Sequence, residues 1–331
     1  MKNLDFKHRL WIAVQCAALG AAMMSGAAHA QDQDQAKPVL ASTTAASAKD
    51  LVLTDDAKCT KCHDESDNPA LLAVGKTKHG TRADTRTPTC VSCHGDSPTH
   101  VNKPDGVKDR PAPDRTFGKK SATPAADRNA ACMTCHEKDT KRHLWEGSTH
   151  EANDVACSSC HQVHTGHDKV RDKQTQSEVC FACHKEQRAQ YNKPSRHPTL
   201  EGKVACSDCH NPHGSAGPKL MKRDSVVDTC YTCHMEKRGP FVRNHQPVAE
   251  DCSICHNPHG TTTPNLLKSR PPYLCQQCHE PSSHRGSVAS LSVTGGSTAT
   301  NTVARGCLNC HTQIHGTNNP QNINTERSFR R

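Results

Sequence analysis

Residues 205–214 read ACSDCHNPHG, a stretch in which a C-x-x-C pair is followed at once by His210 and three residues later by His213. C-x-x-C-H is the signature of covalent c-type haem attachment, in which two thiols bond to the porphyrin and the adjacent histidine ligates the iron. The motif occurs ten times and uses every cysteine beyond residue 30. The sequence therefore predicts ten haems c.

The ten motifs define two sets of predicted haem-binding residues. The covalent attachment sites are Cys59, Cys62, Cys90, Cys93, Cys132, Cys135, Cys157, Cys160, Cys180, Cys183, Cys206, Cys209, Cys230, Cys233, Cys252, Cys255, Cys275, Cys278, Cys307 and Cys310. The proximal iron ligands are His63, His94, His136, His161, His184, His210, His234, His256, His279 and His311.

Zinc ribbons and disulfides are the alternatives for a chain with paired cysteines. Neither requires a histidine after every second cysteine. Histidine makes up only 24 of the 331 residues, so its presence after all ten pairs is not a coincidence. The pattern favours haem over both alternatives.

The composition indicates where the hydrophobic core comes from. Leu, Ile, Val and Phe total 44 of 331 residues, which is below the roughly 20% that is typical of chains that fold on their own. Composition alone would predict disorder. Ten porphyrins supply the missing apolar mass, so we expect a haem-packed multihaem cytochrome c of mostly irregular chain with short α-helices and little or no sheet.

The motifs fall into five tandem repeats of two, and each repeat carries two further histidines. One, here called the spacer histidine, stands between the two motifs: His79, His150, His197, His245 and His284. The other, the trailing histidine, follows the second motif: His100, His164, His213, His259 and His315. These ten are the predicted distal ligands, which would make every haem bis-histidine. Two histidines remain: His143 competes with His150, and His167 with His164; the spacing in the other repeats favours His150 and His164.

The short spacing of His210 and His213 excludes one arrangement. Axial histidines on opposite faces of one haem have Cα atoms about 13 Å apart, from two side chains and two metal–nitrogen bonds of about 2 Å. Three residues span at most about 10.8 Å. His213 is therefore expected to ligate a haem other than that of His210, which would bring two haems close together.

The chain is expected to have four parts. Residues 1–30 have the basic start, apolar run and Ala28-His29-Ala30 end typical of a secretory signal peptide, with an uncleaved membrane anchor as the alternative. Residues 31–50 are a flexible polar segment, 51–316 the decahaem domain, and 317–331 a loose tail.

The charge balance gives no sign of nucleic-acid binding. The formal net charge is +9, and ten haems would add about −20 through their propionates. No nucleic-acid-binding motif is present, so nucleic acid is excluded as a partner.

The order of the motifs resembles the MtrA/DmsE family of periplasmic decahaem cytochromes, including the MtoA and PioA relatives. The resemblance is carried by ACSSCHQVH (156–164), ACSDCHNPHG (205–214), DTCYTCHMEKRGP (228–240), CHNPHG (255–260), LCQQCH (274–279) and CLNCHTQIHG (307–316). It implies an elongated rod of bis-histidine haems that carries electrons, with no enzymatic chemistry, through an outer-membrane β-barrel porin like MtrB or PioB. It further implies location in the periplasm, associated with the outer membrane. Other implied partners are an extracellular multihaem cytochrome, and periplasmic or inner-membrane cytochromes as donor or acceptor, in metal reduction or Fe(II) oxidation.

Two rival functions remain at this stage. A multihaem oxyanion reductase would need an iron with a vacant position, whereas the histidine count here supplies two ligands for each of ten irons. A freely diffusing periplasmic electron carrier would have the same haem pattern without a barrel partner.

Overall fold

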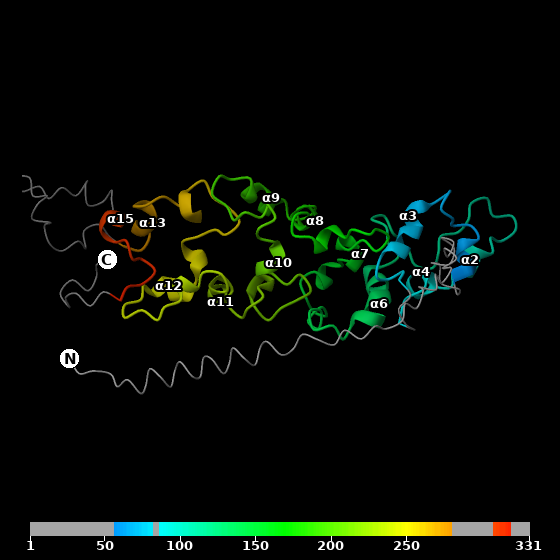
Figure 1. The fold of residues 1–331 in the computed structure, drawn as a ribbon, viewed down its shortest axis with the longest axis horizontal. Helices are drawn as coiled ribbons and strands as arrows, with labels where there is room; N and C mark the ends of the chain where they lie inside the picture. The colour runs from blue at the N-terminus through cyan, green and yellow to red at the C-terminus, as the bar shows by residue number, and fades with distance from the viewer. Residues whose placement is uncertain (1–55, 82–85, 280–306, 319–331) are drawn as a thin grey trace, which may run out of the picture. The chain divides into compact units, whose positions relative to one another are not determined.

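The computed structural model describes residues 56–81, 86–279 and 307–318 (Figure 1). All of them belong to the second of two compact units, Ser47–Arg331. The predicted signal peptide, the segment 31–50, His284 and residues 319–331 of the predicted tail lie outside the described residues.

The described residues form only short helices, the longest of which has twelve residues. The α-helices are α2 (Ala57–Thr60), α3 (Pro69–Leu72), α4 (Cys90–His94), α5 (Pro98–Val101), α6 (Ala125–His136), α7 (Cys157–Cys160), α8 (Gln176–Cys180), α9 (Lys185–Tyr191), α10 (Cys206–Cys209), α11 (Val226–Tyr231), α12 (Gln246–Glu250), α13 (Tyr273–Gln276) and α15 (Cys307–Cys310). The 3-10 helices are η3 (Ala73–Lys76), η4 (Glu151–Asn153), η5 (Lys169–Arg171), η6 (Pro218–Leu220), η7 (Met235–Lys237), η8 (Cys252–Ile254) and η9 (Pro264–Leu266).

Extended pairing is limited to four isolated antiparallel bridges among these residues, namely Ser195 with Thr261, His210 with Met221, Arg243 with Thr317 and His256 with Leu267. The expectation of short helices with little or no sheet is therefore confirmed for the described part. No helix there is long and apolar enough to cross a membrane.

The helices are placed where the motifs need them. In each repeat the first motif begins inside or at the end of a helix, and the second motif begins a new helix with its first cysteine. One helical turn puts residues three apart on the same face, so both thiols of a C-x-x-C can reach one porphyrin. Contacts between α6 and α7, α8 and α10, and α11 and η8 bring the two motifs of a repeat together.

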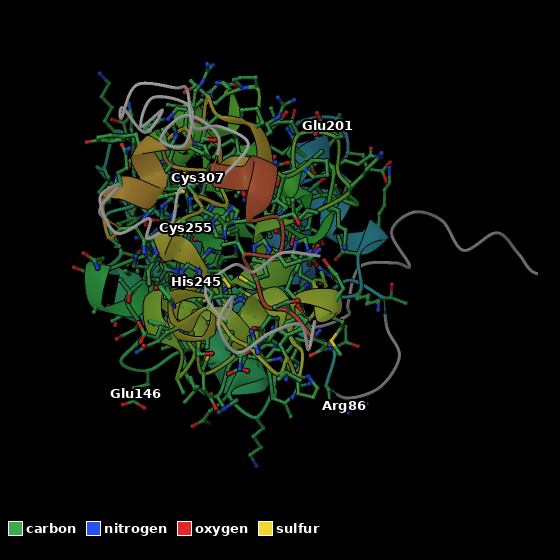
Figure 2. All side chains as sticks on the ribbon, turned by 90° about the vertical axis from the view of Figure 1, so that its left-hand side faces the viewer. Arg86, Glu146, Glu201, His245, Cys255 and Cys307 are labelled. Carbon is green, nitrogen blue, oxygen red and sulfur yellow. The ribbon has the colours of Figure 1, made fainter. Side chains whose placement is uncertain are left out.

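The polypeptide buries little apolar mass of its own. Among the described residues the buried hydrophobic side chains are Ala125, Trp145, Ala156, Phe181, Tyr191, Ala205, Met221 and Val227. Other large apolar side chains, such as Leu71 (38% exposed), Leu144 (40%) and Val163 (42%), line a hollow instead. Figure 2 shows Cys307, Cys255 and His245 within the outline of the protein, whereas Glu146, Glu201 and Arg86 lie at the edge of that outline.

Candidate haem sites

Nine motif histidines each face one histidine from outside the motifs, with the two ring centres 6.0 to 6.3 Å apart. The pairs are His63–His100 (6.1 Å), His79–His136 (6.0 Å), His94–His164 (6.2 Å), His150–His184 (6.1 Å), His161–His213 (6.1 Å), His197–His234 (6.3 Å), His210–His259 (6.2 Å), His245–His279 (6.0 Å) and His256–His315 (6.1 Å). The tenth motif histidine, His311, is described, but His284 is not.

The separation of the rings suits one metal ion between them. Two nitrogens that each lie about 2 Å from a metal are about 4 Å apart. Each ring centre lies behind its nitrogen, so the centres must be farther apart by about the width of a ring. The observed 6.0 to 6.3 Å meets this requirement.

The pairs link neighbouring repeats in a regular way. In repeats one to four, the spacer histidine faces the first-motif histidine of the following repeat, as His150 faces His184. In repeats two to five, the trailing histidine faces the second-motif histidine of the preceding repeat, as His213 faces His161. At the start of the chain, the trailing His100 faces His63 within its own repeat.

The second nitrogen of many of these rings is already bonded. Nδ1 donates to a main-chain carbonyl oxygen in His94, His100, His150, His164, His197, His210 and His256. In His136 and His161 it donates to a carboxylate. A bonded Nδ1 leaves Nε2 as the ligand atom and fixes the ring orientation, which is how metal-binding histidines are usually held.

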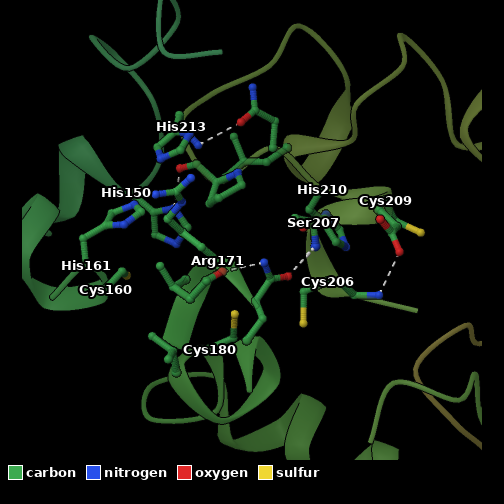
Figure 3. A pocket seen from close by; sticks show the side chains of 18 of the residues that line it. His150, Cys160, His161, Arg171, Cys180, Cys206, Ser207, Cys209, His210 and His213 are labelled. Carbon is green, nitrogen blue, oxygen red and sulfur yellow. Dashed lines mark hydrogen bonds between the residues drawn. The ribbon is translucent and has the colours of Figure 1, made fainter. Parts of the chain in front are cut away.

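The turn that follows His210 explains the opening stretch of sequence. The Asn211 side chain accepts from the main-chain nitrogen of His213 at 3.2 Å and donates to the carbonyl of Gly214 at 2.6 Å. The carbonyl of Pro212 accepts from His150 Nδ1 at 2.8 Å. One turn therefore presents His213 to His161 and orients His150 toward His184, while His210 faces His259. Figure 3 labels four of these side chains, namely His150, His161, His210 and His213.

The following repeat uses the same turn. Asn257 accepts from the main-chain nitrogen of His259 at 3.1 Å, and the carbonyl of Pro258 accepts from His197 at 2.8 Å. Gly260 has φ +147, and a Cβ at this position would lie 2.2 Å from the carbonyl oxygen of Gln190. Glycine is required here because of that close approach.

Left-handed residues supply the acceptors for two motif histidines. Lys219 and Asn265 have φ of 53° and 58°, each within a 3-10 helix that folds back on the motif. Their carbonyls accept from Nδ1 of His210 at 3.0 Å and of His256 at 2.8 Å. This conformation costs about 1–2 kcal/mol for a residue with a Cβ, so the turn is held by the contacts that it makes.

Cysteines of the two motifs in a repeat lie in contact. In all five repeats the first cysteines of both motifs lie close enough for one to shift the pKa of the other: Cys59 with Cys90, Cys132 with Cys157, Cys180 with Cys206, Cys230 with Cys252, and Cys275 with Cys307. The neighbouring Cys230 lowers the pKa of Cys252 to about 7. Figure 3 shows Cys180 and Cys206 lying near each other, from α8 and α10.

Consecutive repeats approach through the second cysteines. Burial raises the pKa of Cys160, and the nearby Cys183 raises it further. Burial and Cys278 raise the pKa of Cys255 in the same way. Burial and the charge of Asp208 raise the pKa of Cys209, and the nearby Cys233 raises it further. Attachment points thus follow one another from repeat to repeat.

A hollow of about 5660 Å³ contains these sites, and its wall includes described cysteines and histidines from all ten motifs. Pockets for one small ligand are usually about 300–1,000 Å³. Burial in this hollow, followed by the positive charges of His161 and Arg142, lowers the pKa of His213 to about 4. A histidine kept neutral has a free nitrogen lone pair for a metal. The donor set, the ring spacing and the size of the hollow all fit covalently attached haems.

The two remaining histidines lie apart from the pairs. His143 is exposed and donates to the carbonyl of Thr140 at 2.5 Å, and His167 lies 3.6 Å from Asp172 with 57% of its side chain exposed. Neither faces a motif histidine among the described ring contacts.

Sequence reasoning missed a set of buried polar side chains near the first motif of three repeats. Asp56, Asn129 and Gln176 accept from main-chain nitrogens in the first turn of the second-motif helix, at 2.7, 2.8 and 2.9 Å. They hold the two motifs of a repeat together. Their position three or four residues before the first cysteine was the available signal. Asp56, Cys59 and Cys90 could also group around a metal ion, but both thiols belong to haem motifs.

The sequence matches two family models. The doubled CXXCH motif matches residues 197–239 and 245–284, and the NrfB-like cytochrome c-type protein model matches residues 90–175.

Three characterised proteins are similar over larger spans. The multihaem cytochrome MtrA of Shewanella baltica (strain OS185) is 47% identical over 270 residues, covering 79% of this chain and 78% of that protein. The cytochrome c-type protein NrfB of Haemophilus influenzae is 36% identical over 149 residues, covering 39% and 64%. NrfB of Escherichia coli O6:H1 is 30% identical over 157 residues, covering 44% and 74%.

Proposed function

Because the chain belongs to the family of the multihaem cytochrome MtrA, we propose that it carries electrons along ten bis-histidine haems and across the outer membrane inside a β-barrel partner. It is a multihaem c-type cytochrome, an electron carrier and not an enzyme. Our proposal concerns the number of haems, their axial ligands, the barrel partner and the path through the membrane.

The nine histidine pairs carry the proposal of bis-histidine ligation. Each joins a motif histidine to a spacer or trailing histidine at a ring separation that suits one iron. After these assignments, His311 and His284 are the remaining motif and spacer histidines, and we assign them to the tenth haem. An iron with two imidazole ligands has no open position for a substrate, which favours a carrier over an oxyanion reductase.

The polypeptide itself would hold the haems, orient their axial ligands and shield them from water. Bound haem supplies the one-electron chemistry. The chain attaches it through the motif cysteines, orients both imidazoles through their Nδ1 bonds, and packs side chains such as Leu71 and Val163 along the hollow. The proximity of Cys180 to Cys206 within a repeat, and of Cys160 to Cys183 across repeats, supports a continuous series of closely spaced sites.

The barrel partner and the periplasmic location rest on resemblance. The motif order resembles the MtrA/DmsE family, and residues 1–30 have the pattern of a secretory signal. A freely diffusing carrier would share the haem sites but not the barrel.

Two measurements test the proposal. The mass of the mature protein should exceed that of the processed chain by ten haems, and its ferric spectrum should be entirely low-spin. Fewer haems, or a high-spin ferric fraction in the intact protein, would contradict the ligand assignment and favour an enzyme. Membrane extraction should recover the protein in complex with an outer-membrane porin; recovery of all of it in the soluble periplasmic fraction would contradict the barrel and favour the free carrier.

A further inference from the structure

One motif histidine differs from its equivalents in the group that holds its Nδ1. In the second motifs of repeats one, three and four, His94, His210 and His256 donate to the main-chain carbonyls of Arg115, Lys219 and Asn265 at 2.9, 3.0 and 2.8 Å. In repeat two, His161 donates instead to the carboxylate of Asp168 at 2.7 Å. A neutral acceptor is thus replaced by a charged one at the same place in the repeat.

The Asp168 carboxylate is largely shielded from solvent. Its side chain is 16% exposed, and its other oxygen accepts from the main-chain nitrogen of Gln162 at 3.3 Å. No lysine or arginine in the described part of the chain forms an ion pair with it. Electrostatic interactions strengthen where water is excluded.

His136 in the same repeat provides an internal comparison. Its Nδ1 donates to Asp139 at 2.9 Å, but this carboxylate is 46% exposed and also forms an ion pair with Arg142. Arg142 further lies 3.1 Å from His136 Nδ1. The cation offsets the negative charge at this ligand, whereas Asp168 has no such partner among the described residues.

The charge at Nδ1 affects the iron through the imidazole ring. A carboxylate acceptor makes the ligating nitrogen more basic than a carbonyl does. A more basic ligand stabilises the ferric state, which carries one more positive charge than the ferrous state, so the reduction potential falls. We propose that the Asp168 carboxylate, acting through His161, lowers the reduction potential of that haem below those of the second-motif haems whose histidines donate to carbonyls.

This inference rests on the proposed ligation of a haem by His161 and His213, and its test separates the two. The full-length, haem-loaded protein is titrated by optical spectroelectrochemistry, after haem content and spin state have been measured. A wild-type protein without ten low-spin haems would contradict the proposed function before any potential is compared.

The main variant is Asp168→Asn, whose amide oxygen can still accept from His161 Nδ1, as the carbonyls do in the other repeats. We expect one component, that of the haem held by His161, to rise so that its equilibrium constant for reduction increases at least tenfold, which is about 59 mV for a one-electron couple. The remaining components stay in place, and Asp168→Glu restores the low potential. An unchanged titration, or loss of one low-spin haem in the Asn variant, would overturn a tuning role.

Two further variants keep the test decisive. Asp172→Asn removes a carboxylate that lies 3.6 Å from His167, which is outside the histidine pairs, and should leave all potentials unchanged. Arg142→Gln removes the cation that offsets Asp139 and should lower the potential of the haem at His136. Because the charge of Arg142 also acts on His213, the potential of the haem at His161 and His213 should shift in the same direction. The Arg142→Gln variant still tests the inference if Asp168→Asn fails to mature. Reduction potentials that stay unchanged or rise in this variant would contradict control by carboxylates that are hydrogen-bonded to iron ligands.

Discussion

The two nitrogens of each imidazole have separate tasks at the scale of the residue. In His150 and His197, Nδ1 donates to the proline carbonyl of a CHNPHG turn, and Nε2 is left for the ring that each faces. The donors come from residues about sixty positions away from their acceptors in the sequence. The orientation of these rings therefore depends on how repeats pack and not only on the motif.

The assignment of His213 can be tested by counting low-spin haems in paired variants. His213→Ala should leave nine of the ten predicted low-spin haems, because His161 loses the ring that faces it. The double variant His161→Ala/His213→Ala should also keep nine, since both changes affect one haem. By contrast, His210→Ala/His213→Ala should keep eight. Spectroscopy with haem quantification gives these counts, and nine in the last variant would mean that His210 and His213 serve the same iron.

At the scale of the element, the tight turn after the second motif decides where the trailing histidine lies. Gly214 has φ +111, and a Cβ there would lie 1.9 Å from the carbonyl oxygen of Leu144. The bulk of any other residue would displace the turn that carries Pro212 and His213. Two histidine pairs depend on this turn, namely His161–His213 and His150–His184.

Gly214→Ala should therefore destabilise the protein and loosen one iron ligand. We expect a loss of about 1–3 kcal/mol from backbone strain, seen as a lower Tm, and a high-spin fraction for one haem. Gly166→Ala is the matched control, because a Cβ there would meet no heavy atom within 4 Å. Equal thermal stability of the two variants would show that the approach to Leu144 can relax.

At the scale of the whole molecule, histidine pairs between neighbouring repeats organise the described residues. Repeats one to four give a histidine forward, and repeats two to five give one back. In repeats two, three and four, every paired histidine faces a histidine of a neighbouring repeat. The repeats therefore depend on one another. The described part of the polypeptide also buries few apolar side chains of its own.

Without haem, the chain should therefore not fold. Expressed in the same cells with the haem-attachment machinery absent, it should lack a cooperative thermal transition and be degraded rapidly, since it buries too little apolar surface to offset chain entropy. Circular dichroism and protease digestion, with haem-loaded protein as the control, measure this. A haem-free chain that unfolds cooperatively would mean that the polypeptide has a sufficient core of its own.

The amino-acid sequence by itself determined the motif cysteines and histidines, the two-motif repeat and the near absence of sheet, because each follows from local spacing or from composition. It also showed, through the reach of three residues, that His210 and His213 cannot share an iron. Only the tertiary structure decided that His213 faces His161, and that Asp168 takes the place of a carbonyl at that ligand. These pairings join residues from different repeats, and the physical reason is that chain geometry restricts neighbours a few residues apart, whereas packing selects partners that are distant in sequence.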